Sequence, residues 1–165
     1  MVEEGWRRFE VGSVVAGIVS VIPRPGAIGL FVDLGGEPRG FVDVLSLPRQ
    51  VEAWPAIGTK STFEVLTRRP TQIRLWPLEP RLRSGPLENG VSEDEWPARK
   101  ARYPIGAILT AEVTGAYAGD STYFVRFEGG WSLLEGEAQV GSRTEYEVIR
   151  HLDTTRRTLL RPAGT

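Results

Sequence analysis

The side chains with the greatest binding capacity in this sequence are aromatic rings and arginines. Phe31, Phe124 and Trp131 lie within short apolar segments, and arginine supplies all of the 20 basic residues except Lys60 and Lys100. A flat ring stacks on other flat groups, and a guanidinium donates paired hydrogen bonds to a phosphate or a carboxylate. These residue types indicate binding chemistry.

Groups for catalysis or metal binding are scarce. The sequence contains no Cys, and His151 is its only His, which excludes a thiol nucleophile and a site with several His ligands. The segment 35–40 is rich in glycine but lacks the Lys and the Ser or Thr of a phosphate-binding loop, so we interpret it as a hairpin turn. We expect a protein without enzymatic activity, without a cofactor and without a metal site.

Arginines occur in pairs at two similar places. Arg68 and Arg69 precede the last apolar segment of the first half, and Arg156 and Arg157 precede that of the second half. The 20 basic residues are balanced by 21 acidic ones, for a net charge of -1, which is unlike a domain that mainly neutralises phosphates. A basic patch therefore requires that folding gathers the arginines on one surface.

The two halves of the sequence repeat one pattern. VGSVVAGIV at 11–19 aligns with IGAILTAEV at 105–113, and LFVDL at 30–34 aligns with YFVRF at 123–127. IGTKSTFEVL at 57–66 aligns with VGSRTEYEVI at 140–149. The shared order of these segments predicts two copies of one small domain, of which the second is shorter between its third and fourth strands.

Apolar and polar residues alternate within these segments, as they do in strands with one buried face. The alternation places Leu30, Val32 and Leu34 in a core and turns Phe31 outward; in the second copy Phe124 and Arg126 point outward. We expect five strands in the first copy, at 14–22, 29–34, 40–44, 61–66 and 72–76. The predicted fold class is all-β, with two small five-stranded OB-type Greek-key barrels.

Three regions follow from this pattern. We expect an OB-type domain at 1–80, a linker rich in Pro, Gly and charge at 81–102, and a second, shorter OB-like domain at 103–165. Ser92 and Glu95 have the spacing of a capping box, which predicts a short helix inside the linker. The N-terminal residues contain no apolar signal core and no apolar run is long enough to cross a membrane, so we expect a cytoplasmic protein.

The first copy resembles the S-one domain family, named after the ribosomal protein that contains repeats of it. The resemblance lies in VGSVVAGIVSVIPRPGAIGLFVDLGGEPRGFVDVLSLP and in the later AIGTKSTFEVL and IRLWP, and covers about residues 8–78. It implies an RNA-binding face made of two aromatic rings and a His. Phe31 occupies the second aromatic position, whereas Ile28 and Asp43 stand at the other two.

Two functions are open at this point. The first is binding of single-stranded RNA or other nucleic acid without catalysis, through a surface formed by Phe31, Arg68, Arg69, Arg74, Phe124, Arg126, Trp131, Arg156 and Arg157. The second is a protein-interaction module, such as an immunity or antitoxin factor or an accessory subunit, that covers a protein partner. The near-zero net charge favours the second, and the family resemblance favours the first. The sequence does not define the oligomeric state.

Overall fold

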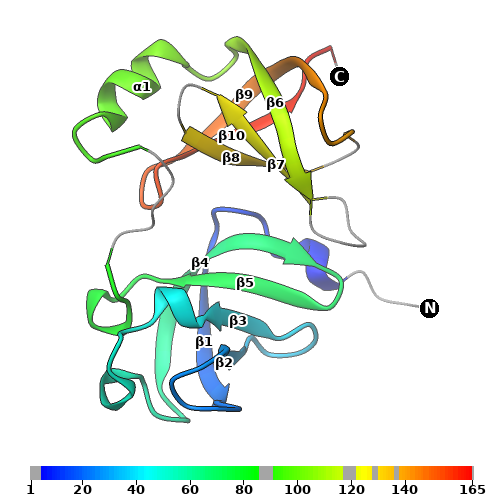
Figure 1. The fold of residues 1–165 in the computed structure, drawn as a ribbon. Coiled ribbons are helices and arrows are strands. Elements are labelled where there is room, and N and C mark those ends of the chain that lie inside the picture. The colour runs from blue at the N-terminus through cyan, green and yellow to red at the C-terminus, as the bar shows by residue number, and fades with distance from the viewer. Residues whose placement is uncertain (1–4, 86–90, 117–121, 128–129, 136–137, 165) are drawn as a thin grey trace. The chain divides into compact units, whose positions relative to one another are not determined.

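The computed structural model describes residues 5–85, 91–116, 122–127, 130–135 and 138–164. The chain divides into two compact units, Met1–Pro86 and Leu87–Thr165. Each unit contains one closed barrel (Figure 1), which we call barrel 1 and barrel 2 in chain order. In the described part of the chain, every helix is too short or too polar to cross a lipid bilayer.

Barrel 1 consists of β1 (Val14–Val21), β2 (Gly29–Asp33), β3 (Gly40–Asp43), β4 (Lys60–Arg69) and β5 (Gln72–Pro77). Its strands are ordered β1-β2-β3-β5-β4, and β4 pairs again with β1 to close the barrel. The β3–β5 pair is parallel, and the other pairs are antiparallel. This order is that of a Greek-key OB-type barrel.

Alternation along each strand builds the core of barrel 1. Leu30 and Val32 on β2 are 1% and 0% exposed, while Phe31 between them is only half-buried. Val42, Val65, Ile73 and Leu75 belong to the same buried cluster, together with residues of β1 and β4 and of segments outside the strands. The outward direction of Phe31, predicted from the sequence, is confirmed.

Barrel 2 consists of β6 (Ile108–Ala116), β7 (Thr122–Phe127), β8 (Gly130–Glu135), β9 (Arg143–Leu152) and β10 (Arg157–Pro162). Its strand order β10-β8-β7-β6-β9 is that of barrel 1, and β8 and β10 form the parallel pair. The predicted fold class is therefore confirmed. The third strand of this copy has no recognisable sequence signature, yet β8 fills the same place as β3.

The strand registers define which residues correspond between the barrels. Leu30 pairs with Val42 in barrel 1, and Tyr123 pairs with Leu134 in barrel 2. When this correspondence is continued along the third strands, Phe41 of barrel 1 corresponds to Leu133 of barrel 2, and Arg39 corresponds to Trp131. On the last strands, Leu75 pairs with Val65 and Leu160 pairs with Val148, which matches Arg74 with Leu159.

A short helix, α1 (Trp96–Arg102), packs on barrel 2. Ser92 and Glu95 exchange the two hydrogen bonds of a capping box, at 3.2 Å each, and the helix begins directly after Glu95. Arg99 is 5% exposed; its Nη2 donates to the Phe127 carbonyl at 2.7 Å and its guanidinium lies 4.4 Å from the Phe127 ring centroid. The helix is thus anchored by a buried, charge-assisted hydrogen bond.

Gly29, the first residue of β2, allows β2 and β3 to pack closely. Its φ is +145°, and a Cβ there would lie 2.1 Å from the Val42 carbonyl oxygen and 2.9 Å from Phe41 Cζ. Backbone strain at such a residue costs about 1 to 3 kcal/mol, and the clash adds to it. We expect Gly29→Ala to lower the free energy of unfolding by at least about 2 kcal/mol, measured by urea denaturation.

Gly26→Ala is the matched control for this substitution. Gly26 also has a positive φ, of +85°, but no atom lies within 4 Å of a Cβ built there. Its substitution therefore carries the backbone cost without the clash. Equal denaturation midpoints for the two variants would show that the close approach at Gly29 contributes nothing to stability.

Candidate nucleic-acid interface

Two phenylalanines lie side by side on the outer surface of barrel 1. Phe31 on β2 is in register with Phe41 on β3, and their ring centroids are 5.2 Å apart with the planes inclined by 51°. Phe31 is half-buried, whereas Phe41 is 8% exposed. Phe31 therefore presents the accessible ring, and Phe41 supports it.

Two arginines flank these rings. The Arg39 guanidinium carbon lies 4.2 Å from the Phe31 ring centroid, and that of Arg74 lies 5.6 Å from the Phe41 centroid. Arg39 is exposed and Arg74 is half-buried. We call Phe31, Arg39, Phe41 and Arg74 the stacking face. It combines flat apolar surface with positive charge, as in cation–π pairs.

Asp43, at the end of β3, fixes the position of Arg74. Its Oδ2 accepts a hydrogen bond from Arg74 Nη2 at 2.7 Å, and its Oδ1 accepts one from the Leu45 backbone amide at 2.9 Å. The second bond caps the 3-10 turn Val44–Ser46. The carboxylate holds the guanidinium beside Phe41 and also reduces the positive charge of the stacking face.

The other predicted arginines of barrel 1 lie elsewhere. Arg68 Nη1 donates to the carbonyls of Arg7 and Phe9 at 2.8 and 3.3 Å, and its guanidinium lies 5.6 Å from the Trp6 ring centroid. Arg68 thus holds the N-terminal turn Gly5–Arg8 against β4. Arg69 ends β4 in register with Gln72 and is half-buried.

The candidates of barrel 2 are distributed over several strands. Phe124 and Arg126 both lie on β7; Phe124 is half-buried and Arg126 is exposed. Trp131 belongs to β8, where the backbone register pairs it with Arg126; its side chain is outside the described part of the structure. Phe124 corresponds to Phe31, but the positions of Arg39 and Arg74 hold Trp131 and Leu159.

The paired arginines do not occupy matching positions. Arg68 and Arg69 end β4, whereas Arg157 begins β10, because the turn between the last two strands is longer in barrel 2. Arg157 is 1% exposed and its Nε donates to Thr155 Oγ1 at 3.0 Å, while Arg156 Nε donates to the Val91 carbonyl at 2.7 Å. Arg157 is therefore enclosed by its own barrel.

Two members of the stacking face, Phe41 and Arg39, are not among the site residues predicted from the sequence. Phe41 belongs to the Gly-Phe-Val segment of β3. In the sequence analysis this segment counts only as part of the family pattern. Arg39 lies in the segment interpreted as a hairpin turn. The adjacency of Phe31 and Phe41 follows from antiparallel pairing of consecutive strands, so the hairpin itself carried a signal that could have identified Phe41.

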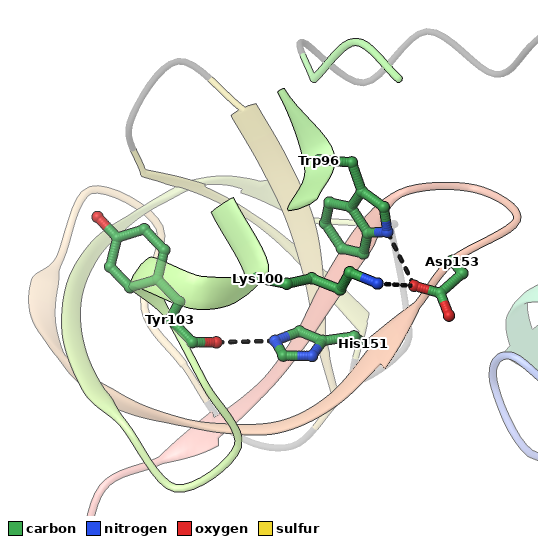
Figure 2. Close-up of polar contacts among 5 residues, drawn as sticks. All are labelled: Trp96, Lys100, Tyr103, His151 and Asp153. Atoms are coloured by element: carbon green, nitrogen blue, oxygen red, sulfur yellow. Dashed lines mark hydrogen bonds and ion pairs between the residues drawn. The ribbon is translucent and has the colours of Figure 1, made fainter. Parts of the chain in front are cut away.

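A polar cluster joins α1 to the turn that follows β9 (Figure 2). Trp96 Nε1 and Lys100 Nζ both contact Asp153 Oδ1, at 2.8 and 2.9 Å. His151 Nε2 lies 2.7 Å from the Tyr103 carbonyl oxygen, and the His151 ring meets that of Trp96 edge to face. The hydrogen bonds from Lys100 and then Trp96 lower the pKa of Asp153 below its ordinary value.

No family model matches the sequence, and no curated protein matches it. Among solved structures, a multidomain protein with nucleic acid binding domains from Streptococcus pneumoniae is similar over 92% of this chain and 51% of its own, with 18% identity and a TM-score of 0.36. GSP13 from Bacillus subtilis is similar over 42% of this chain and 55% of its own, with 28% identity and a TM-score of 0.36. Each match spans about half of the other protein.

The lowered pKa of Asp153 makes attachment of α1 dependent on pH. A carboxylate whose pKa is lower in the folded state stabilises that state fully above its unfolded pKa and loses this effect as pH falls through the folded pKa. We expect the protection of the α1 amides against hydrogen exchange to be constant from pH 7 to about 4 and to decrease below that. The Asp153→Asn variant should show a smaller decrease.

Glu93→Gln serves as the control, since Glu93 is an exposed carboxylate in the turn before the same helix. This variant should retain the pH dependence of the unmodified protein. An unchanged pH dependence in Asp153→Asn would contradict the role of the Asp153 carboxylate.

Proposed function

We propose that the protein binds single-stranded RNA through the stacking face of barrel 1, without catalysing a reaction. The observation that carries the proposal is the row of Phe31 and Phe41, with Arg39 over the first ring and Arg74 beside the second. OB-type barrels commonly bind oligonucleotides on the surface of their second and third strands, which is where both rings lie.

Stacking supplies the part of the affinity that does not depend on sequence. One base stacked on one aromatic ring contributes about 1 to 3 kcal/mol. Phe31 is the ring with accessible surface, and Arg39 covers it in the unbound protein. Because Arg39 is long and exposed, it can move aside and hold a phosphate next to the base.

Charge limits the strength of this binding. Arg39 and Arg74 supply two positive charges, and Asp43 offsets one of them. Few counterions are therefore released on binding, and the dependence of affinity on salt is shallow. We expect micromolar affinity and little preference among bases, since stacking accepts any base and the phosphate contacts do not distinguish them.

The preference for RNA over DNA or a protein partner is supported by the resemblance of residues 8–78 to the S-one family. Barrel 2 adds less to such a surface. Its Phe124 has no arginine at the positions that correspond to Arg39 and Arg74, which hold Trp131 and Leu159. Arg68, Arg156 and Arg157 are engaged within their own units, so we leave them out of the contact surface and keep Arg69 and Arg126 as outlying candidates.

Fluorescence anisotropy with a labelled single-stranded RNA of mixed sequence tests the proposal. We expect Phe31→Leu, which keeps an apolar side chain, to weaken binding about 5- to 150-fold through the loss of one stacked base. Arg39→Gln should weaken binding and reduce the slope of log K against log salt by about 0.7. A single-stranded DNA of the same sequence should bind more weakly.

Phe124→Leu is the matched control, because it makes the same substitution at the corresponding position of barrel 2. It should change the affinity much less than Phe31→Leu does. If RNA fails to saturate the unmodified protein at high micromolar concentration in low salt, RNA binding is wrong and a protein partner becomes the better hypothesis. Equal losses in the two Phe variants would move the site away from barrel 1.

A further inference from the structure

Barrel 2 contains a hollow of about 430 Å³ on its surface. It is bordered by β6, β7 and β9 and by the residue that follows α1, and its walls include Tyr103, Thr110, Glu112, Arg126, Phe127 and Arg143. Its volume is in the range of sites for small molecules. The hollow and the surface that corresponds to the stacking face share β7, but Phe124, the counterpart of Phe31, is not among the residues that line the hollow.

Three charged residues form a row across the hollow. Glu112 on β6 is in register with Arg126 on β7 and with Arg143 on β9. All three are exposed. Residues directly opposite each other in antiparallel strands have Cβ atoms about 5 Å apart, so Glu112 stands between the two arginines in the row. The row has a net charge of +1.

Barrel 1 has a hollow at the same place with a different lining. It measures about 370 Å³ and includes Ile18, Asp33 and Lys60. Ile18 is in register with Asp33 and with Lys60, as Glu112 is with Arg126 and Arg143. The hollow is thus common to both barrels. The row in barrel 1, however, has no net charge and has an apolar residue at its centre. Only barrel 2 pairs the cavity with two arginines.

Tyr103, an aromatic residue in the wall of the barrel 2 hollow, is held in place by residues that do and do not line the hollow. Figure 2 shows the Tyr103 ring turned away from His151, while its carbonyl oxygen lies 2.7 Å from His151 Nε2. The ring also meets the Phe127 ring edge to face, with centroids 5.4 Å apart. Tyr103, whose ring packs on Phe127, therefore lines the same hollow as the two arginines.

We propose that this hollow binds the phosphate group of a nucleotide or of a strand end, with Arg126 and Arg143 on the phosphate and Tyr103 against the attached sugar or base. Arginine donates hydrogen bonds in the planar arrangement that phosphate oxygens accept. A phosphate alone is far smaller than the hollow, which leaves room for the attached group. Glu112 stands between the two arginines in the row, and its negative charge opposes the anion, so it lowers the affinity.

Isothermal titration calorimetry of the whole chain with inorganic phosphate and with adenosine monophosphate tests this site. We expect both to bind, and Arg143→Gln to weaken each by at least about tenfold. Glu112→Gln should strengthen binding about two- to fivefold, because it removes the opposing charge. If neither ligand binds, or if Glu112→Gln does not raise the affinity, the row is surface charge without a binding site. Either result overturns the proposal.

Lys60→Gln is the matched control at the position of barrel 1 that corresponds to Arg143. It should leave both affinities unchanged, and an equal loss would show that the anions bind by general charge alone. Inorganic phosphate has no base that could stack on Phe31, so Phe31→Leu should leave its affinity unchanged, and failure of this site is distinguishable from failure of the RNA proposal. In the Phe31→Leu variant, tighter binding of a 5′-phosphorylated tetranucleotide than of adenosine monophosphate identifies a strand end as the ligand, and equal binding identifies a free nucleotide.

Discussion

The parallel pairing of β3 with β5 is the constraint on which the stacking face of barrel 1 depends. Without it, the strands would form an open sheet, and Phe41 and Arg74, which are far apart in the sequence, would not meet. The pairing sets Phe41 opposite Arg74. Because side chains alternate along each strand, the same register turns Val42 and Ile73, both fully buried, into the core. One register therefore determines both the core and the stacking face.

Barrel 2 is closed by the same strand pairing, but different side chains lie on its outer surface. Its parallel pair joins Leu160 and Leu134, both buried, so the same pairing contributes to the core. On the outside, arginines are lost from the positions of Arg39 and Arg74 and appear instead on β7 and β9. The two barrels therefore offer different chemistry from equivalent backbones, as expected when function resides in side chains placed on a common fold.

The sequence predicts features that depend on local periodicity and on the repeat. The alternation around Phe31 and the matching of β1 with β6 and of β4 with β9 needed only spacing within a segment. The neighbours of Arg74, the enclosure of Arg157 and the position of Glu112 between two arginines depend on which strands pair and in what register. Such pairing is set by the whole barrel, so segments read one at a time do not reveal it.

The near-neutral charge of the chain is consistent with both proposed sites, because each is built from a small number of arginines opposed by one carboxylate. Asp43 forms an ion pair with Arg74, and the strand registers place Glu112 between Arg126 and Arg143. A carboxylate next to a guanidinium restricts its orientation but weakens its attraction for an anion. In both proposed sites the carboxylate reduces the attraction for an anion, so the proposed binding depends on stacking on Phe31 and on Tyr103 for the rest of its affinity.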